Sequence, residues 1–353
     1  MQTPIDHEQR IAATADDSLS RSHKGEGPAA AGRHSLAAKA LAYVSIARPD
    51  HWGKNVFMAL GVVLAYFYRP HAFSWSTLGT IVWAFMATCL VASSNYVLNE
   101  ILDAARDREH PKKRWRPIPA GKVWLPAAYA QWVLLGVVSL AMAWQINAAF
   151  FAAAGLLLVM GLVYNVPPIR SKELPYLDVL SESLNNPIRL LLGWFAVIAH
   201  EVPPISLMLA YWMIGAFFMA AKRFAEYRHI NDPARAAAYR SSFRHYNEKR
   251  LLISIAFYIT TFALFLGVFI IRYKLELILS FPLVAGFICY YLHIAYKDES
   301  AAQSPEKLYR ERGLMAYLLV CLIVFFALMF VEIPVLYEWF NVAPSTVSPL
   351  WRI

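Results

Sequence analysis

Apolar residues along this chain gather in blocks of about 20, the length at which an α-helix crosses the hydrocarbon core of a bilayer. Short polar or turn-forming segments, such as Val166-Pro167-Pro168, separate the blocks. We expect nine spans, near residues 54–68, 77–100, 125–144, 147–164, 177–199, 204–222, 251–271, 277–296 and 314–332. The pattern therefore predicts an all-α, polytopic membrane helical bundle of about nine transmembrane helices.

Before the first span the pattern changes. Residues 1–41 are mostly polar or small and contain no apolar core of a signal peptide. We expect a disordered cytoplasmic tail over 1–41 and one transmembrane catalytic domain over 42–353, whose first span begins as an interfacial helix at 45–49.

Composition agrees with a membrane protein, because 58% of the residues are hydrophobic and only 16% are charged. A soluble domain usually carries about 25% charged residues. The net charge of +9 would suit nucleic acid, but the basic residues occupy alternate loops, so we expect no nucleic-acid partner. The three cysteines all lie inside apolar spans, which disfavours disulfides and zinc.

The distribution of Lys and Arg predicts the orientation. Loops 104–123, 165–174, 222–250 and 297–312 hold 21 of these residues, against four in the segments on the opposite side. Cytoplasmic loops carry the excess of positive charge. With nine spans, the N-terminus and the basic loops are then cytoplasmic and the C-terminus lies outside.

Asn99, Asp103 and Asp107 follow one another at intervals of four residues, which places them on one face of a helix. Amide and carboxylate oxygens suit Mg²⁺, which takes one or two carboxylates together with phosphate oxygens of a substrate. The basic residues that follow would neutralise a diphosphate; they are Lys112, Lys113, Arg114 and Arg116. The alternative interpretation is a solvated helix end.

A second acidic pair, Asp178 and Glu182, opens the fifth span, close to Tyr164 and Lys172. Arg189 follows about two turns later within an apolar run, where a charge usually faces a cavity or a partner. The alternative for Arg189 is a structural ion pair with Glu182 or Asp178.

Two more cationic groups lie at span ends. Lys54 and Asn55 begin the first span, and Lys222 and Arg223 end the sixth, so each pair is placed to meet an anionic headgroup or phosphate. For Lys222 and Arg223 the positive-inside rule is an equally good explanation. The basic loop from there to Arg250, including Arg240, is predicted to face lipid headgroups.

The N-x-x-x-D-x-x-x-D element at 99–107, the nine spans and the second acidic motif resemble the UbiA-type intramembrane prenyltransferase superfamily, over about residues 42–332. Further stretches are similar to one branch, the polyprenyl-phosphate (decaprenyl-phosphate) phosphoribosyltransferases. They are Arg48-Pro49 with Trp52-Gly53-Lys54-Asn55, Asp107-Arg108-Glu109-His110-Pro111 with Lys113-Arg114 and Arg116-Pro117-Ile118, and Lys222-Arg223 with Ala225-Glu226. The chain departs at Glu100 and Glu182, where the superfamily often has Asp.

This resemblance implies a UbiA-like fold in a bacterial inner (plasma) membrane, and transfer of 5-phosphoribosyl from phosphoribosyl diphosphate to a polyprenyl phosphate. It implies Mg²⁺ as cofactor, on Asn99, Asp103 and Asp107, with Asp103, Asp107 and Asp178 as catalytic residues. The substrate-binding residues would be Lys54, Asn55, Lys113, Arg114, Arg116, Tyr164, Lys172, Glu182, Arg189, Lys222 and Arg223. The resemblance also implies that the protein works in contact with the bilayer, and it is compatible with a homo-oligomer.

Two other functions compete with this one. A UbiA-type prenyltransferase would move a polyprenyl group from its diphosphate to an aromatic acceptor, using the same magnesium site. The extra cations favour two phosphorylated substrates instead. A transporter would place charges near span centres, whereas here most lie at cytoplasmic span ends, Arg189 excepted.

Overall fold

The structure is a computed structural model that describes residues 36–109, 113–303, 305–343 and 350–353. Most of the predicted tail, and Lys112 of the basic loop, lie outside these residues. The first described helix, α2 (Leu36–Ala47), begins before the expected boundary at residue 41 and runs through the stretch expected to start the first span. Arg48 follows its last residue, and the φ of 53° at Arg48 turns the chain into the next segment.

The described chain is almost entirely helical, as the sequence predicts, and seven of its helices are long and apolar enough to cross a membrane. They are α4 (Trp75–Glu109), α5 (Leu125–Trp144), α6 (Ala148–Asn165), α9 (Ile205–Ile230), α11 (Glu248–Tyr273), the continuous stretch of η6 (Leu275–Ser280) and α12 (Phe281–Ala295), and α13 (Arg312–Phe330). All seven coincide with expected spans. The count of nine is not confirmed, because the first and fifth spans are divided into shorter helices.

The first span consists of a 3₁₀ segment, η1 (Pro49–Phe57), and α3 (Met58–Tyr68). The fifth consists of α7 (Leu177–Ser183) and α8 (Asn185–Phe195). Pro187 explains that division, because it has no N–H to donate to the carbonyl group four residues earlier. A periodicity of apolar residues cannot reveal such breaks.

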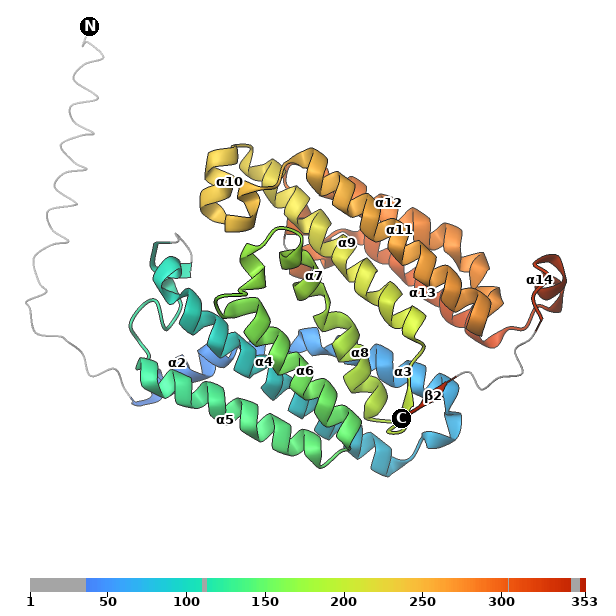
Figure 1. The fold of residues 1–353 in the computed structure, drawn as a ribbon, viewed down its shortest axis with the longest axis horizontal. Helices are drawn as coiled ribbons and strands as arrows, with labels where there is room; N and C mark the ends of the chain where they lie inside the picture. The colour runs from blue at the N-terminus through green and yellow to red at the C-terminus, as the bar shows by residue number, and fades with distance from the viewer. Residues whose placement is uncertain (1–35, 110–112, 304, 344–349) are drawn as a thin grey trace, which may run out of the picture.

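The transmembrane helices form two groups (Figure 1). In one group α3, α4, α6 and α8 enclose a buried apolar cluster, with α5 along the outside. In the other, α9, α11, α12 and α13 enclose a second cluster. Helices α7 and α8 both contact α9, so the fifth span joins the two groups.

Helices α3 and α8 pack backbone against backbone because each has a glycine at the contact. A Cβ atom on Gly61 would collide with the carbonyl oxygen of Leu190, and one on Gly193 with that of Met58. Small residues allow such close approach between membrane helices. The contact fixes η1 and α8, which carry Asn55 and Arg189, against each other.

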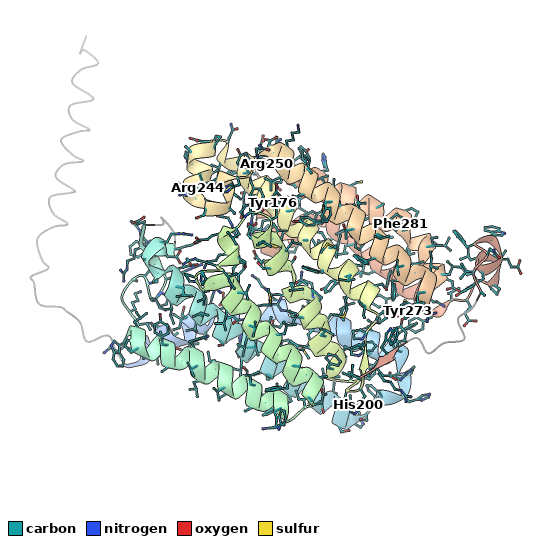
Figure 2. All side chains as sticks on the ribbon, in the orientation of Figure 1. Tyr176, His200, Arg244, Arg250, Tyr273 and Phe281 are labelled. Atoms are coloured by element: carbon teal, nitrogen blue, oxygen red, sulfur yellow. The ribbon has the colours of Figure 1, made fainter. Side chains whose placement is uncertain are left out.

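The remaining elements are short. They are η2 (Pro70–Ala72), η3 (Lys113–Trp115), η4 (Ser171–Glu173), β1 (Glu201–Val202), α10 (Pro233–Tyr239), η5 (Ser241–Arg244), η7 (Ala301–Gln303), η8 (Pro305–Arg310), α14 (Pro334–Trp339) and β2 (Trp351–Arg352), which pairs antiparallel with β1. Figure 2 shows Tyr176, Arg244 and Arg250 at one end of the bundle and His200 and Tyr273 at the other. The basic loops thus gather at the end that carries α10.

Candidate functional site

The acidic motif lies on the last turns of α4, which continues to Glu109 instead of ending near residue 100. Asp103 is 18% exposed, and its Oδ1 accepts hydrogen bonds from Arg170 (Nη2, 2.8 Å) and Lys172 (Nζ, 2.7 Å). Both cations come from the loop between α6 and α7. The end of α4 and this loop therefore form one charged surface.

Asp107, one turn later, is buried and paired more completely. Its Oδ2 lies 2.6 Å from Arg116 Nη1, and its Oδ1 lies 3.9 Å from Lys113 Nζ. The same segment returns to α4 a second time, where the Ile118 N–H donates to the buried Glu100 carboxylate at 3.1 Å. The loop after α4 therefore folds back over the acidic helix end and brings two of the predicted cations with it.

Asn99 joins this group through Asn165, the last residue of α6. The Oδ1 atom of Asn165 accepts from Asn99 Nδ2 at 2.6 Å and from Lys172 Nζ at 2.9 Å. Since Asn99 uses its nitrogen here, its side-chain oxygen is the atom left for a ligand. Asn99 is thus connected to Lys172 through Asn165, and Lys172 in turn to Asp103.

The second acidic motif has a different environment. Asp178 is fully buried, and its carboxylate accepts hydrogen bonds from Tyr246 Oη at 2.7 Å, Ser242 Oγ at 3.2 Å and Arg223 Nε at 3.2 Å. A carboxylate so enclosed orders its neighbours. Its carboxylate is thus held by three neighbouring side chains, and its predicted catalytic role stays a prediction.

Arg223 is likewise committed to protein groups. Besides Asp178, it reaches Glu182 at 2.9 Å and Glu226 at 3.1 Å, so three carboxylates surround one buried guanidinium. Glu182, whose side chain is 35% exposed, also accepts from Tyr164 Oη at 3.2 Å. Tyr164 relates this network to the first acidic motif, because the Lys172 Nζ lies 6.0 Å from the centre of its ring.

Arg240 is the clearest departure from the sequence prediction. We expected the loop that contains it to face lipid headgroups, yet Arg240 Nε lies 3.4 Å from the Asp178 carboxylate. Its Nη2 donates to Tyr164 Oη at 3.5 Å and to the Lys172 carbonyl oxygen at 3.4 Å. Arg240 therefore bridges the two acidic motifs, and that prediction is wrong for this residue.

Arg189 differs from Arg223. Its Nε donates to Asn55 Oδ1 at 3.0 Å, and its Nη1 to the Asn185 carbonyl oxygen at 3.4 Å. Within the described part of the chain no carboxylate lies within ion-pair distance of Arg189. The expected alternative, an ion pair with Glu182 or Asp178, is thus wrong, and Asn55 is brought to Arg189 as a neutral partner.

The other predicted cations lie nearer the surface. Lys54 is exposed at the start of the first span, and Lys222 is half-buried beside Arg223. Arg114 is exposed, with its guanidinium 4.9 Å from the centre of the Trp115 ring. None of these three has a geometry that by itself assigns a ligand.

Burial changes the proton affinity of groups in the loops. It lowers the pKa of Lys172 and of Lys113, while the nearby carboxylates of Asp103 and Asp107 oppose the shift. Burial, reinforced by the charge of Asp178, raises the pKa of Tyr246, so its phenol remains a hydrogen-bond donor. Arg240, Ser242 and Tyr246 were missed by sequence reasoning, which had no local signal for their approach to Asp178.

The oxygen donors at the end of α4 form an incomplete ligand set for a magnesium ion, without substrate phosphates and waters. Across the described residues, no three side chains of His, Cys, Asp or Glu come together as a metal-binding group. Magnesium, however, is commonly held by one or two carboxylates, with substrate phosphates and waters completing the shell. The amide of Asn99 and the carboxylates of Asp103 and Asp107 fit that arrangement.

A cavity of about 600 Å³ lies at the other end of the bundle, where Figure 2 labels His200. Residues around β1 and the segment after α3 line it, including Arg69, His71 and Glu201. None of the predicted site residues lines this cavity. The charge networks around α4 and α7, and not this cavity, are therefore the candidate functional site.

The chain is similar to known proteins in sequence and in fold. The family model described as the UbiA prenyltransferase family matches residues 55–319. The decaprenyl-phosphate phosphoribosyltransferase of Mycobacterium tuberculosis (strain ATCC 25618 / H37Rv) is 34% identical over 217 residues, which cover 59% of this chain and 67% of that protein. The enzyme of the same name from Mycolicibacterium smegmatis is 33% identical over 190 residues, 52% of this chain and 56% of that protein.

The fold has a solved counterpart as well. A UbiA homolog from Archaeoglobus fulgidus, whose structure was determined with DMAPP and Mg²⁺ bound, superposes with a TM-score of 0.60. The two share 20% sequence identity, and the match covers 82% of this chain and 99% of the other. At that identity the likeness concerns the fold.

Proposed function

The chain belongs to the UbiA prenyltransferase family and is a membrane transferase, and we propose that it moves a 5-phosphoribosyl group from phosphoribosyl diphosphate to a polyprenyl phosphate. The products would be polyprenylphosphoryl-5-phosphoribose and diphosphate. The relatives named decaprenyl-phosphate phosphoribosyltransferase support this choice of substrates. We further propose that residues 42–353 form the catalytic unit and that its site faces the cytoplasm.

One observation carries the proposal: four cations gather around the two aspartates of α4. Arg170 and Lys172 contact Asp103, while Arg116 and Lys113 approach Asp107. Glu173 also pairs with Arg170, so the four cations face three carboxylates and still outnumber them, which suits a diphosphate. Each cation contacts a carboxylate that would hold Mg²⁺, so a magnesium diphosphate would meet the same four cations.

Magnesium, when bound through Asn99, Asp103 and Asp107, would supply charge stabilisation to the diphosphate. The protein's cations act on the same group. As the bond between the ribose C1 and the diphosphate oxygen breaks, its electron pair moves onto the diphosphate. Lys172 and Arg170 then stabilise more charge in the transition state than in the ground state.

The acceptor completes the reaction. An oxygen of the polyprenyl phosphate forms the new bond to C1, which has become oxocarbenium-like. A phosphate monoester is already anionic at neutral pH, so no strong general base is needed. Arg240 and Asp178, held by Tyr246, position the wall of the site opposite α4.

A second candidate is prenyl transfer to an aromatic acceptor, because the family description names prenyl transfer. One assay separates the two. Purified protein with Mg²⁺ is given phosphoribosyl diphosphate labelled in the ribose, together with decaprenyl phosphate; we expect label in the lipid phase. Label that stays in water, with alkylation of an aromatic acid by a polyprenyl diphosphate, would contradict the proposal. Asp103→Asn is the inactive control.

A further inference from the structure

Arg189 is a cation within a membrane-spanning segment whose described partners are neutral. Asn55 Oδ1 lies 3.0 Å from its Nε, and the Asn185 carbonyl oxygen lies 3.4 Å from its Nη1. Arg223, on α9, makes the contrast, because it faces three carboxylates. A charged side chain inside a bundle normally pairs with an opposite charge or faces a polar ligand. Arg189 therefore lacks the anion that Arg223 has.

Four elements meet around this guanidinium. Asn55 belongs to η1 and Arg189 to α8, while Tyr96 of α4 and Tyr211 of α9 lie close enough to interact with it electrostatically. Asn55 is itself held in place, because its Nδ2 donates to Cys89 Sγ at 3.3 Å. The group thus presents one cation and several neutral polar atoms from four directions.

The position of this group relates it to the magnesium site. Tyr96 precedes Asn99 by three residues on α4, so the two side chains are neighbours on the helix surface. The indole of Trp52 donates to Ser93 Oγ at 2.9 Å and keeps η1 against α4. Arg189 therefore lies near the metal-binding face of α4, about one turn deeper in the bundle.

We propose that Arg189 and Asn55 form a second anion site, which binds a phosphate monoester. This rests on the proposed function, in which both substrates carry one: the acceptor lipid has a terminal phosphate, and the donor has a phosphate on the ribose C5. The guanidinium binds two phosphate oxygens, and Asn55 holds it in place by accepting a hydrogen bond from its Nε. Arg223, already surrounded by carboxylates, is excluded from this task.

The test measures binding as well as turnover. Purified wild type, Arg189→Gln and Arg189→Lys are titrated with farnesyl phosphate and, separately, with ribose 5-phosphate, while thermal stability is followed. Arg69→Gln is the matched control, because Arg69 is paired with Glu201 at the far end of the bundle. We expect Arg189→Gln to weaken binding of one phosphate at least tenfold, Arg189→Lys to keep part of it, and Arg69→Gln to bind as the wild type does.

The arms distinguish the source of the phosphate. Loss of farnesyl phosphate binding, with a raised KM for the polyprenyl phosphate, assigns the site to the acceptor. Loss of ribose 5-phosphate binding, with a raised KM for the donor, assigns it to the donor. Unchanged binding of both phosphates by a folded variant would overturn the inference. If Arg189→Gln does not fold, the decision passes to Arg189→Lys, where unchanged affinity for both ligands overturns it.

The proposed function can fail separately. If the wild type transfers no ribosyl group yet binds farnesyl phosphate through Arg189, the proposal of ribosyl transfer is wrong and the proposal of the anion site stands. If Arg189→Gln turns over with wild-type KM values, the reaction stands and the anion site is wrong.

Discussion

Replacing Asp103 with Asn removes one negative charge and keeps the shape of the side chain. Its Oδ1 now accepts two charge-assisted hydrogen bonds, from Arg170 at 2.8 Å and from Lys172 at 2.7 Å. An amide oxygen can still accept both. Each bond would weaken from about 2 to about 1 kcal/mol, so the loss of stability is about 2 kcal/mol, reduced by the partial exposure of the pair.

The effect on the reaction should be much larger. The substitution takes one of the two proposed carboxylate ligands from the magnesium diphosphate and leaves Lys172 and Arg170 held only by a neutral oxygen. Loss of one preorganised electrostatic contact typically lowers kcat by about 10² to 10³, or about 3 to 4 kcal/mol. We therefore expect Asp103→Asn to be folded, nearly inactive, and to need more Mg²⁺ for half-maximal rate.

The assay is ribosyl transfer measured against magnesium concentration, with a thermal melt of the same preparation. Glu173→Gln is the matched control. Glu173 also pairs with Arg170 at 2.8 Å and with Arg106, but it is not a proposed ligand. Glu173→Gln should keep kcat within about threefold of wild type. An Asp103→Asn protein with more than about a tenth of wild-type kcat and an unchanged magnesium dependence would refute the assignment.

Three further outcomes follow from the same contacts. Gly193→Ala would force a Cβ into the Met58 carbonyl oxygen and should destabilise the protein by about 1–3 kcal/mol. Gly155→Ala is the control, because a Cβ there meets open space and should not destabilise the protein. Equal melting temperatures of the two variants would contradict the packing of α3 against α8. Tyr246→Phe leaves an Asp178 oxygen unpaired, at a cost of about 1–3 kcal/mol. Since the raised pKa keeps the phenol protonated until strongly alkaline pH, that difference should be constant between about pH 6 and about pH 9 and shrink above it. Chelation by EDTA should abolish transfer with the helical circular dichroism unchanged, and Mg²⁺ alone should restore it; activity that survives EDTA would exclude the magnesium role.

Most of the bundle could be predicted because membrane insertion leaves a strong, local signal. A block of about 20 apolar residues is visible in the sequence whatever its neighbours do. The division of the fifth span at α7 and α8 and the 3₁₀ geometry of η1 leave no mark in the pattern of apolar residues. They depend on one proline and on contacts such as that between Gly61 and Leu190, which exist only after the helices have packed.

The candidate site divides in the same way. The spacing of Asn99, Asp103 and Asp107 is a property of one helix, so their common face was predictable. The approach of Arg240 and Tyr246 to Asp178 joins segments that are more than 60 residues apart, and the basic loop resembles any cytoplasmic loop in composition. Sequence could show that cations were present there, but only tertiary contacts show which of them reach the site.

The buried cluster of Asp178, Glu182 and Arg223 has a consequence for biosynthesis. As the chain leaves the ribosome, the fifth span begins with two carboxylates, and each raises the cost of inserting it, by less than the roughly 3 kcal/mol that a charge costs at the bilayer centre. Their counter-charge is on α9, 45 residues later. Stable insertion of α7 and α8 thus waits for α9, and the two spans should leave the translocon as a pair. A chain truncated before Arg223 would present its fifth segment to quality control as a poorly inserted helix.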